Sequence, residues 1–151
     1  MMITYAVEDI DAVREEMEPL TLLHWAELAG DVDEIPLDFD WELYTNLQAL
    51  GKIMFTTVRD DGQLVGYHCA LVSNHMHYKS TLHGIVDFLW IHPAFRRGFI
   101  GINLLKFVEA ELRERGVRKV IMSSKNKLDT SALLHRLGYN YSERIFTKFL
   151  D

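Results

Sequence analysis

Two arginines and two glycines stand close together in the stretch "HPAFRRGFIG" at residues 92–101. Apolar residues at helical spacing follow, so the stretch is predicted to be a turn that leads from a strand into a helix. The start of a helix presents unpaired N–H groups and a partial positive charge, which favour phosphate. Arginine adds bidentate phosphate contacts, and glycine lets a diphosphate approach the backbone. We therefore expect a phosphate-binding turn at Arg96, Arg97, Gly98 and Gly101, although a tight turn with solvated arginines stays open.

A carboxylate and a histidine lie in the apolar strand "TLHGIVDFLWI", just before that turn. By the two-residue period of a strand, Asp87 is expected on the same face as Leu89 and Ile91, and His83 shares that face. A carboxylate in apolar surroundings can have a raised pKa that suits a general base. Asp87 is therefore the first candidate for a catalytic base and His83 the second. A purely structural role remains open for both.

The remaining elements must hold these residues in place. Residues 2–7 are predicted to form a strand. A helix is expected to begin after Asp9 or Asp11, with an apolar face formed by Val13, Met17, Leu20 and Leu23. A second helix is expected over residues 41–50. Asp61 and Gly62 lie between two β-rich runs, which is a strong hairpin signal. The expected order is β-α-α-β-β-β-α-β-α-β in one domain of residues 1–151, a mixed sheet with helices on its faces, and the last strand or strands come from "YNYSERIFTKFL".

Charge is divided unevenly along the chain. Residues 1–93 carry 4 basic and 16 acidic side chains, a net charge of −12, whereas residues 94–151 carry 12 basic and 6 acidic ones, a net charge of +6. The acidic run around Pro36 includes Asp31, Asp33, Glu34, Asp38 and Asp40. A solvated acidic face would explain this division. Two ligands of opposite charge, an anion on the basic half and a cation on the acidic half, would also explain it.

Composition excludes several classes of protein. No run of 18 apolar residues predicts a membrane span, and no basic-then-apolar segment predicts a signal peptide. Cys69 is the only cysteine, so we expect no internal disulfide and a cytoplasmic location. The pair His75 and His77 lacks carboxylates or cysteines at ligand spacing nearby, so no metal is expected.

The turn and its flanks resemble motif A of the GNAT superfamily of N-acetyltransferases, whose pattern R/Q-x-x-G-x-G/A follows a strand ending in "V-x-P". Arg96 matches the first position of the motif and Gly101 its last, while Phe99 stands where the motif has a glycine. "DDGQLVGY" is similar to the family's central hairpin and "ALLHRLGY" to its "lYeklGF" helix. The resemblance implies an α/β (α+β) fold with a mixed, mostly antiparallel central sheet, helices on both faces and splayed fourth and fifth strands.

The same resemblance implies an acyltransferase that moves an acetyl group from acetyl-CoA to a primary amine of a small molecule or peptide. The pantetheine arm would pair with the fourth strand, and backbone amides after Arg96 would hold the pyrophosphate. The general acid of the family is a tyrosine at the position of Leu134, so the usual acid is missing. The cofactor-binding residues implied are Leu89, Trp90, Ile91, Arg96, Arg97, Gly98, Phe99, Ile100, Gly101 and Asn126.

Two other functions remain open at this point. One is a compact, phage-type acyltransferase that modifies nucleic acid, against which the acidic N-terminal half argues. The other is a catalytically inactive binding module, which Phe99 and Leu134 leave open. The acceptor is expected to be cationic, a homodimer is left open, and neither a membrane nor a nucleic acid is expected as a partner.

Overall fold

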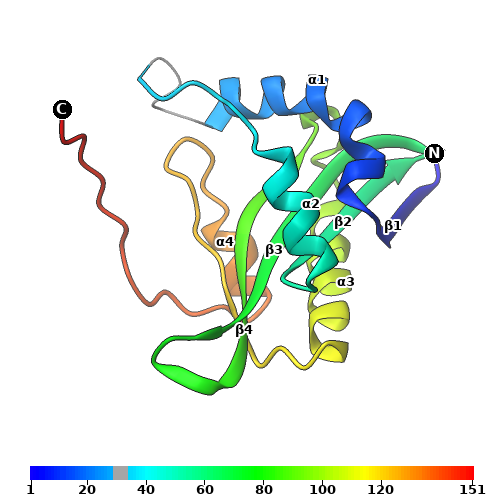
Figure 1. The fold of residues 1–151 in the computed structure, drawn as a ribbon. Helices are drawn as coiled ribbons and strands as arrows, with labels where there is room; N and C mark the ends of the chain where they lie inside the picture. Colours follow the sequence, from blue (N-terminus) through cyan, green and yellow to red (C-terminus); the bar gives the residue numbers. More distant parts are fainter. Residues whose placement is uncertain (29–33) are drawn as a thin grey trace.

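A five-stranded sheet with helices on both faces forms the molecule, in a computed structural model that describes residues 1–28 and 34–151 (Figure 1). The strands follow the order β1-β2-β3-β4-β5, with antiparallel pairing from β1 to β4 and parallel pairing between β4 and β5. This arrangement confirms the expected fold class. The elements are β1 (Ile3–Val7), α1 (Ile10–Leu28), α2 (Trp41–Ala49), β2 (Ile53–Asp60), β3 (Gln63–His75), β4 (Tyr78–Ile91), a 3₁₀ turn (Pro93–Phe95), α3 (Ile100–Glu114), β5 (Lys119–Ile121) and α4 (Ser131–Arg136).

Each face of the sheet carries its own hydrophobic core. On one face α1 and α2 cover Phe55, Tyr67, Phe88 and Trp90. On the other face α3 covers a second set of apolar side chains from β2, β3 and β4. Because both faces are covered, β2 and β3 are buried along most of their length, and the sheet holds the site rigidly from behind.

The buried face of α1 differs from the expected one near its end. Leu23 was expected in the apolar stripe, but its side chain is 52% exposed, whereas Thr21 and His24 are buried. The buried positions Ile10, Val13, Met17, Thr21 and His24 keep the 3.6-residue period, and the leucine does not. The helix therefore turns a histidine, and not a leucine, toward the sheet.

A β-bulge in β4 changes the face on which Asp87 lies. The register between β3 and β4 passes from Cys69 opposite Phe88 to Ala70 opposite Val86, so Asp87 has no residue opposite it. Beyond the bulge, Leu89 and Ile91 pack toward α3. Asp87 contacts Tyr44, which packs on the core beneath α1 and α2. The prediction that Asp87 shares a face with Leu89 and Ile91 is therefore wrong, because the extra residue breaks the two-residue period.

Strands β4 and β5 separate soon after they meet. Their parallel pairing joins only His83, Gly84 and Ile85 to Lys119, Val120 and Ile121. From Val86 onward, no other strand pairs with that side of β4 in residues 1–28 and 34–151. The splayed strands expected from the family resemblance are thus present, and they leave the backbone of β4 open toward a cavity.

The last expected strand is absent. Residues 139–151 contain no helix or strand, and the side chains of residues 140–151 are exposed. In Figure 1 this segment leaves the body beyond α4 and runs to the C-terminus away from the sheet. A strand needs a partner edge, and this segment follows no edge of its own chain, so its β-rich composition produces no ladder.

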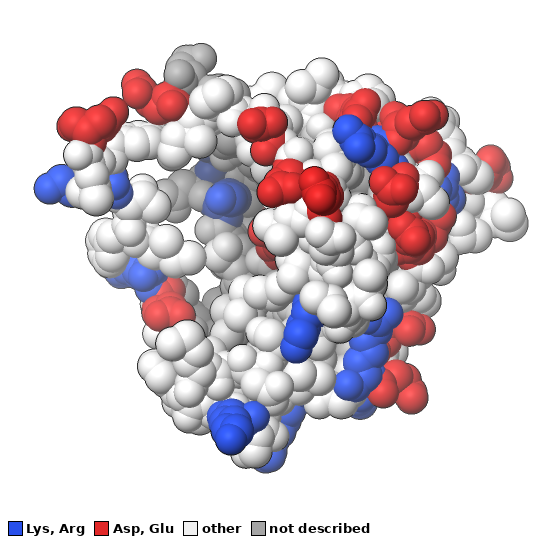
Figure 2. Space-filling view, viewed as in Figure 1, with Lys and Arg blue, Asp and Glu red and all other residues white. Residues whose placement is uncertain are grey.

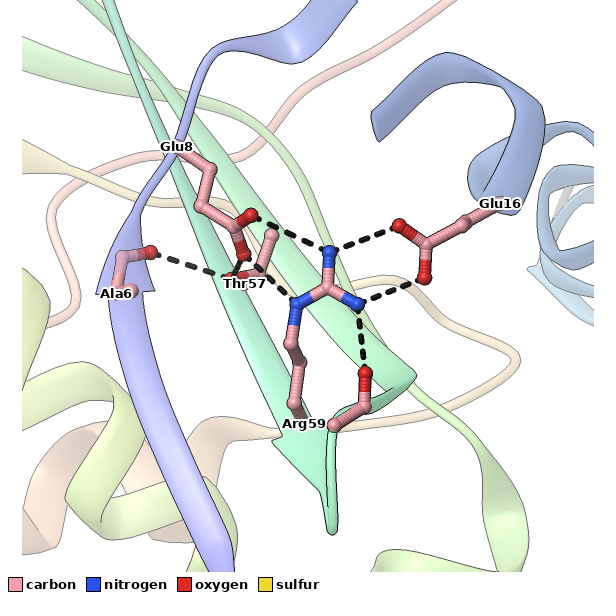
Figure 3. A network of polar contacts seen from close by, with 6 residues as sticks. Ala6, Glu8, Glu16, Thr57 and Arg59 are labelled. Atoms are coloured by element: carbon pink, nitrogen blue, oxygen red, sulfur yellow. Dashed lines mark hydrogen bonds and ion pairs between the residues drawn. The ribbon is translucent and has the colours of Figure 1, made fainter. Parts of the chain in front are cut away.

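Arg59 joins the opposite end of the sheet to α1 (Figure 3). Its guanidinium donates to the carboxylates of Glu8 and Glu16 and to the carbonyl of Gly62, with N–O distances of 2.7–3.3 Å. The Thr57 hydroxyl also donates to Glu8. These bonds lower the pKa of both carboxyls, although burial of Glu8 opposes the shift. The strands β1 and β2 and the helix α1 are therefore tied together by one satisfied network.

Candidate active site

A cavity of about 480 Å³ opens where β4 and β5 separate. Its walls come from β4, the start of α3, the segment after β5, and residues of α1 and α4. Of the residues expected at a site, Asp87 and seven expected to bind cofactor line it, namely Leu89, Trp90, Ile91, Arg96, Arg97, Gly98 and Gly101. The structure also describes Phe99, Ile100, Asn126 and His83, and none of these four residues lines the cavity.

The start of α3 borders this cavity without a side-chain cap. Phe99 is the N-cap residue, makes no capping hydrogen bond and is 62% exposed. Gly98 before it has φ +58°, a conformation that favours glycine. The first amides of a helix have no carbonyl partner within it, so they remain available to an acceptor from outside. A Cβ at Gly101 would lie 3.7 Å from the Ile91 side chain and 4.0 Å from Leu133, both of which line the cavity.

The two arginines of the turn have different surroundings. Arg96 donates to both oxygens of Glu27 on α1, and its Nε donates to the carbonyl of Ile91 at 2.7 Å. Arg97 lines the cavity, and its contact in the structure is a long one of 3.7 Å to the sulfur of Met1. Arg96 therefore braces the end of β4 against α1, and Arg97 is the arginine whose guanidinium carries no carboxylate partner among the described residues.

His24 is a buried histidine in the wall of the cavity. Its Nδ1 lies 2.9 Å from the Tyr67 hydroxyl, and its ring stacks on Trp90 with 5.7 Å between centroids. Burial lowers the pKa of His24 to about 4, and the nearby charges of Arg96 and Lys125 act in the same direction, against Glu27. The imidazole is thus neutral at pH 7 and can exchange a hydrogen bond with a ligand without carrying charge.

Asp87 lies where two cavities meet. It lines the cavity beside β5 and also a second cavity of about 510 Å³ beneath α2, as do Trp25 and Val86. The side chain is exposed, so the apolar surroundings expected from the strand sequence are not present. Its Oδ2 accepts a hydrogen bond from the Tyr44 hydroxyl, and burial together with Asp87 raises the pKa of Tyr44. Tyr44 therefore remains a hydrogen-bond donor that fixes one oxygen of the carboxylate.

The two cavities differ in charge. Arg97 and Lys125 line the first, whereas Asp38 and Asp40 line the second, and both share Asp87. In Figure 2 acidic side chains gather over the part of the surface where Figure 1 places α1 and α2. Asp31 and Asp33, which belong to the same acidic run, lie outside the described residues.

His83 lies apart from both cavities. It is buried beneath the β3–β4 hairpin, where its Nδ1 is 3.1 Å from the carbonyl of Thr81 and its ring stacks on Tyr78. His75 also contacts this ring. In the described part of the chain no three His, Cys, Asp or Glu side chains group closely enough to hold a metal ion.

Sequence reasoning missed several residues of the cavity. His24, Lys125 and Thr130 were not singled out, and each reaches the wall from an element far from the arginine turn. At the position of the family's tyrosine, Leu134 is buried, while its neighbour Leu133 lines the cavity. The position of His24, two helical turns after Met17, was the one available signal, but the nearby leucines of α1 obscured it.

Similarity to known proteins agrees with this geometry. The sequence model of the Acetyltransferase (GNAT) family matches residues 11–139. No curated protein is similar enough to count as a relative. None of the helices in the described residues is long and apolar enough to cross a membrane.

Solved acetyltransferases share the fold at low identity. One is a predicted acetyltransferase with acetyl-CoA from Clostridium acetobutylicum, which is 15% identical to this chain. The alignment covers 99% of this chain and 97% of that one, with a TM-score of 0.73. A glucosamine-6-phosphate N-acetyltransferase from Arabidopsis thaliana is 13% identical with a TM-score of 0.74, and an aminoglycoside acetyltransferase from an uncultured soil metagenomic sample is 15% identical with a TM-score of 0.77. Each of these two covers all of this chain and all of its own. The match over residues 11–139 and the splayed sheet together place this chain in the GNAT family of acetyltransferases.

Proposed function

We propose that this protein transfers the acetyl group of acetyl-CoA to a primary amine. The observation that carries the proposal is the meeting of two cavities of different charge at one carboxylate, Asp87. The basic cavity beside β5 suits an anionic cosubstrate, and the acidic cavity beneath α2 suits a cationic amine. The reacting groups would then meet at the wall that the two cavities share.

The basic cavity has the parts that a CoA molecule needs. The uncapped start of α3 offers backbone amides to a pyrophosphate, and Arg97 supplies a guanidinium without a carboxylate partner in the described chain. The unpaired side of β4 at residues 89–91 can hydrogen-bond the amides of an extended arm. Phe99 replaces the glycine of the motif, but its side chain is exposed and does not line this cavity.

A thioester supplies a carbonyl carbon that an amine can attack. For this step the ammonium must first lose a proton, which Asp87 would accept directly or through water while its Oδ2 holds the hydrogen bond from Tyr44. The C–N bond then forms as the C–S bond breaks, the nitrogen releases its second proton to water, and the departing thiolate takes a proton. His83 lies outside both cavities, so we keep Asp87 alone in the proposed mechanism.

The source of the thiolate's proton is proposed to be water. Helix α4 contains no tyrosine, and the residue that it contributes to the cavity wall is Leu133. The same feature favours the second candidate function, a GNAT-fold module that binds CoA without turnover. A nucleic-acid acceptor is disfavoured by the acidic cavity, because phosphates would be repelled there.

The proposal is tested by CoA binding and thiol release together. Isothermal calorimetry should detect CoA binding to the wild type, and acetyl-CoA should release thiol when a panel of amines, peptides and nucleosides is added. Gly101→Val should abolish both, because its side chain would extend into the cavity between Ile91 and Leu133. Met76→Val, at a side chain that is 95% exposed on the β3–β4 turn, is the control. Binding without thiol release would favour the inactive module, and no CoA binding at millimolar concentration would exclude both functions.

The homodimer that the sequence left open also remains a proposal, and the C-terminal segment supports it. Tyr141, Ile145, Phe146 and Leu150 are each at least 67% exposed, more apolar surface than a soluble monomer usually presents in one place. Strand β5 is at the edge of the described sheet. Exchange of these segments onto the β5 edges of two copies would cover both features. Light scattering should find a dimer that Ile145→Pro separates into monomers, and a wild type that is monomeric at all concentrations would exclude it.

A further inference from the structure

The acidic cavity beneath α2 has a composition that narrows the class of acceptor. Three carboxylates line it, those of Asp38, Asp40 and Asp87, and no Lys, Arg or His does so among the described residues. Asp40 accepts a hydrogen bond from the backbone amide of Leu43, and Asp87 accepts one from Tyr44. Both partners are neutral, so neither bond compensates the negative charge. A phosphate or carboxylate on the acceptor would be repelled here.

The rest of this cavity is apolar. The rings of Trp25, Phe39 and Tyr44 form one wall, with centroids 5.2 Å apart for Trp25 and Phe39 and 5.6 Å apart for Phe39 and Tyr44. Leucine and isoleucine side chains from α2, β2, β3 and β4 form the remainder. A polyol bound here would find hydrogen-bond acceptors mainly at the three carboxylates, and its hydroxyl groups against the apolar walls would lose their hydrogen bonds to water. A hydrophobic body would bury its surface instead.

The carboxylate of Asp87 and the exposed apolar side chain of Leu43 lie at different ends of the cavity. Asp87 is at the inner end, because it also lines the CoA-side cavity, whereas Leu43 is 51% exposed and marks the outer end on α2. An amine whose nitrogen reaches Asp87 would therefore place its carbon skeleton among the aromatic rings. Glu27 and Arg96, which pair with each other, line neither end of this second cavity.

We propose that the acceptor is a hydrophobic primary amine without an acidic group, such as an arylalkylamine. This inference rests on the proposed acetyl transfer and specifies its acceptor. The anionic aminosugars and free amino acids are excluded by the carboxylates, and neutral aminosugars by the apolar walls. The cavity of about 510 Å³ accommodates a ring with a short aminoalkyl chain.

Matched acceptors test this class directly. 2-Phenylethylamine and phenylalanine differ only in a carboxylate, and 2-phenylethylamine and glucosamine differ in the polarity of the body. We expect kcat/KM for 2-phenylethylamine to exceed both others by roughly 10²-fold, the scale on which a pocket rejects a mismatched group. Equal or better turnover of phenylalanine or glucosamine would overturn the inference while leaving acetyl transfer intact.

A charge at the outer end of the cavity should lower turnover of the proposed acceptor. Leu43→Arg places a cation where the hydrophobic body of the amine would lie, so kcat/KM for 2-phenylethylamine should fall at least tenfold. Leu50→Arg is the matched control, because Leu50 follows α2, is 72% exposed and lies outside the cavity. An unchanged kcat/KM in Leu43→Arg would contradict the placement of the acceptor. Absence of thiol release with every amine, despite CoA binding, would instead reject the proposed function and the inference with it.

Discussion

The two ends of the sheet differ in whether their backbone and arginine groups have partners within the protein. At the β1–β2 end, every residue of β1 pairs with β2, β2 pairs with β3 over its whole length, and Arg59 is bonded to Glu8, Glu16 and Gly62. At the β4–β5 end, pairing stops after three residues of each strand, α3 begins without a cap, and Arg97 has no carboxylate partner in the described chain. Groups that are satisfied internally contribute to stability, and groups that are left open are available to a ligand.

This difference predicts that substitutions at the two ends should affect different measurements. Changes near Asp87 and Arg97 should alter catalysis and binding, with little effect on folding. Changes at Arg59 should alter folding stability and leave substrate affinities unchanged. A substitution that moved both properties equally would show that the two ends are not separate in this way.

The largest expected effect is on turnover. Asp87→Asn keeps the shape of the side chain and the contact with Tyr44 but removes the base, so kcat should fall about 10²-fold or more while CoA affinity stays constant. Steady-state kinetics and calorimetry measure the two quantities. Tyr44→Phe is a milder companion that should lower kcat less. If Asp87→Asn folds and acetylates at the wild-type rate, Asp87 has no role in proton transfer.

The next effect is on stability. Arg59→Ala leaves Glu8 and Glu16 without their shared partner in a half-buried position, so the free energy of unfolding should fall by roughly 2–3 kcal/mol. Urea denaturation measures this difference. Arg14→Ala is the matched control, because its exposed pair with Glu18 and its contact over the Trp41 ring should together contribute about 1 kcal/mol or less. Equal losses in the two variants would contradict the special role of the network.

Binding of CoA should depend on Arg97 more modestly. Arg97→Ala should weaken CoA binding by roughly 1–3 kcal/mol, the range for a hydrogen bond to a charged group, with no loss of thermal stability. The effect should shrink for pantetheine, which lacks the pyrophosphate. Arg113→Ala, near the opposite end of α3, serves as the control. Loss of stability without loss of affinity would assign Arg97 to the fold instead.

The smallest effect concerns pH and two buried histidines, His24 in the cavity wall and His68 in the central strand β3. Burial lowers the pKa of both His24 and His68 to about 4. The unfolded chain therefore binds more protons below pH 6.5, so this part of the stability is complete above 6.5 and is lost as the pH falls toward 4. Each histidine contributes at most about 1.4 kcal/mol per pH unit. Thermal denaturation between pH 7 and 5 measures how steeply stability falls with pH, and this dependence should be shallower in His24→Gln and in His68→Gln. A dependence equal to that of the wild type would contradict the role of the two histidines.

Local features of the sequence were sufficient for much of the fold. Asp61 and Gly62 predicted a tight turn and adopt φ +47° and +89° in it, and the spacing of Leu104, Leu105, Val108 and Leu112 predicted α3. The arginine–glycine turn was recognisable because its residues are neighbours in the sequence, and Arg96, Arg97, Gly98 and Gly101 line the cavity. Leu89, Trp90 and Ile91 also line it, and they were expected from the family resemblance.

Features that depend on distant partners were not predictable. The bulge at Asp87 arises from the register of β3 against β4, and a register cannot be read from one strand. His24 reaches the cavity only because α1 packs across the sheet beside Trp90 and Tyr67. The last strand was predicted from composition, but composition does not supply the edge that a strand needs.

Hydrogen exchange with and without CoA tests the difference between the two ends most directly. The account predicts that CoA slows exchange of backbone amides at residues 89–91 and 97–101, where the structure leaves β4 and the start of α3 open. Amides of β2, which pairs with β1 on one side and β3 on the other, should exchange at the same rate in both conditions. Protection of β2 by CoA, or no protection at residues 89–101 at millimolar CoA, would contradict the placement of the cosubstrate between β4 and β5.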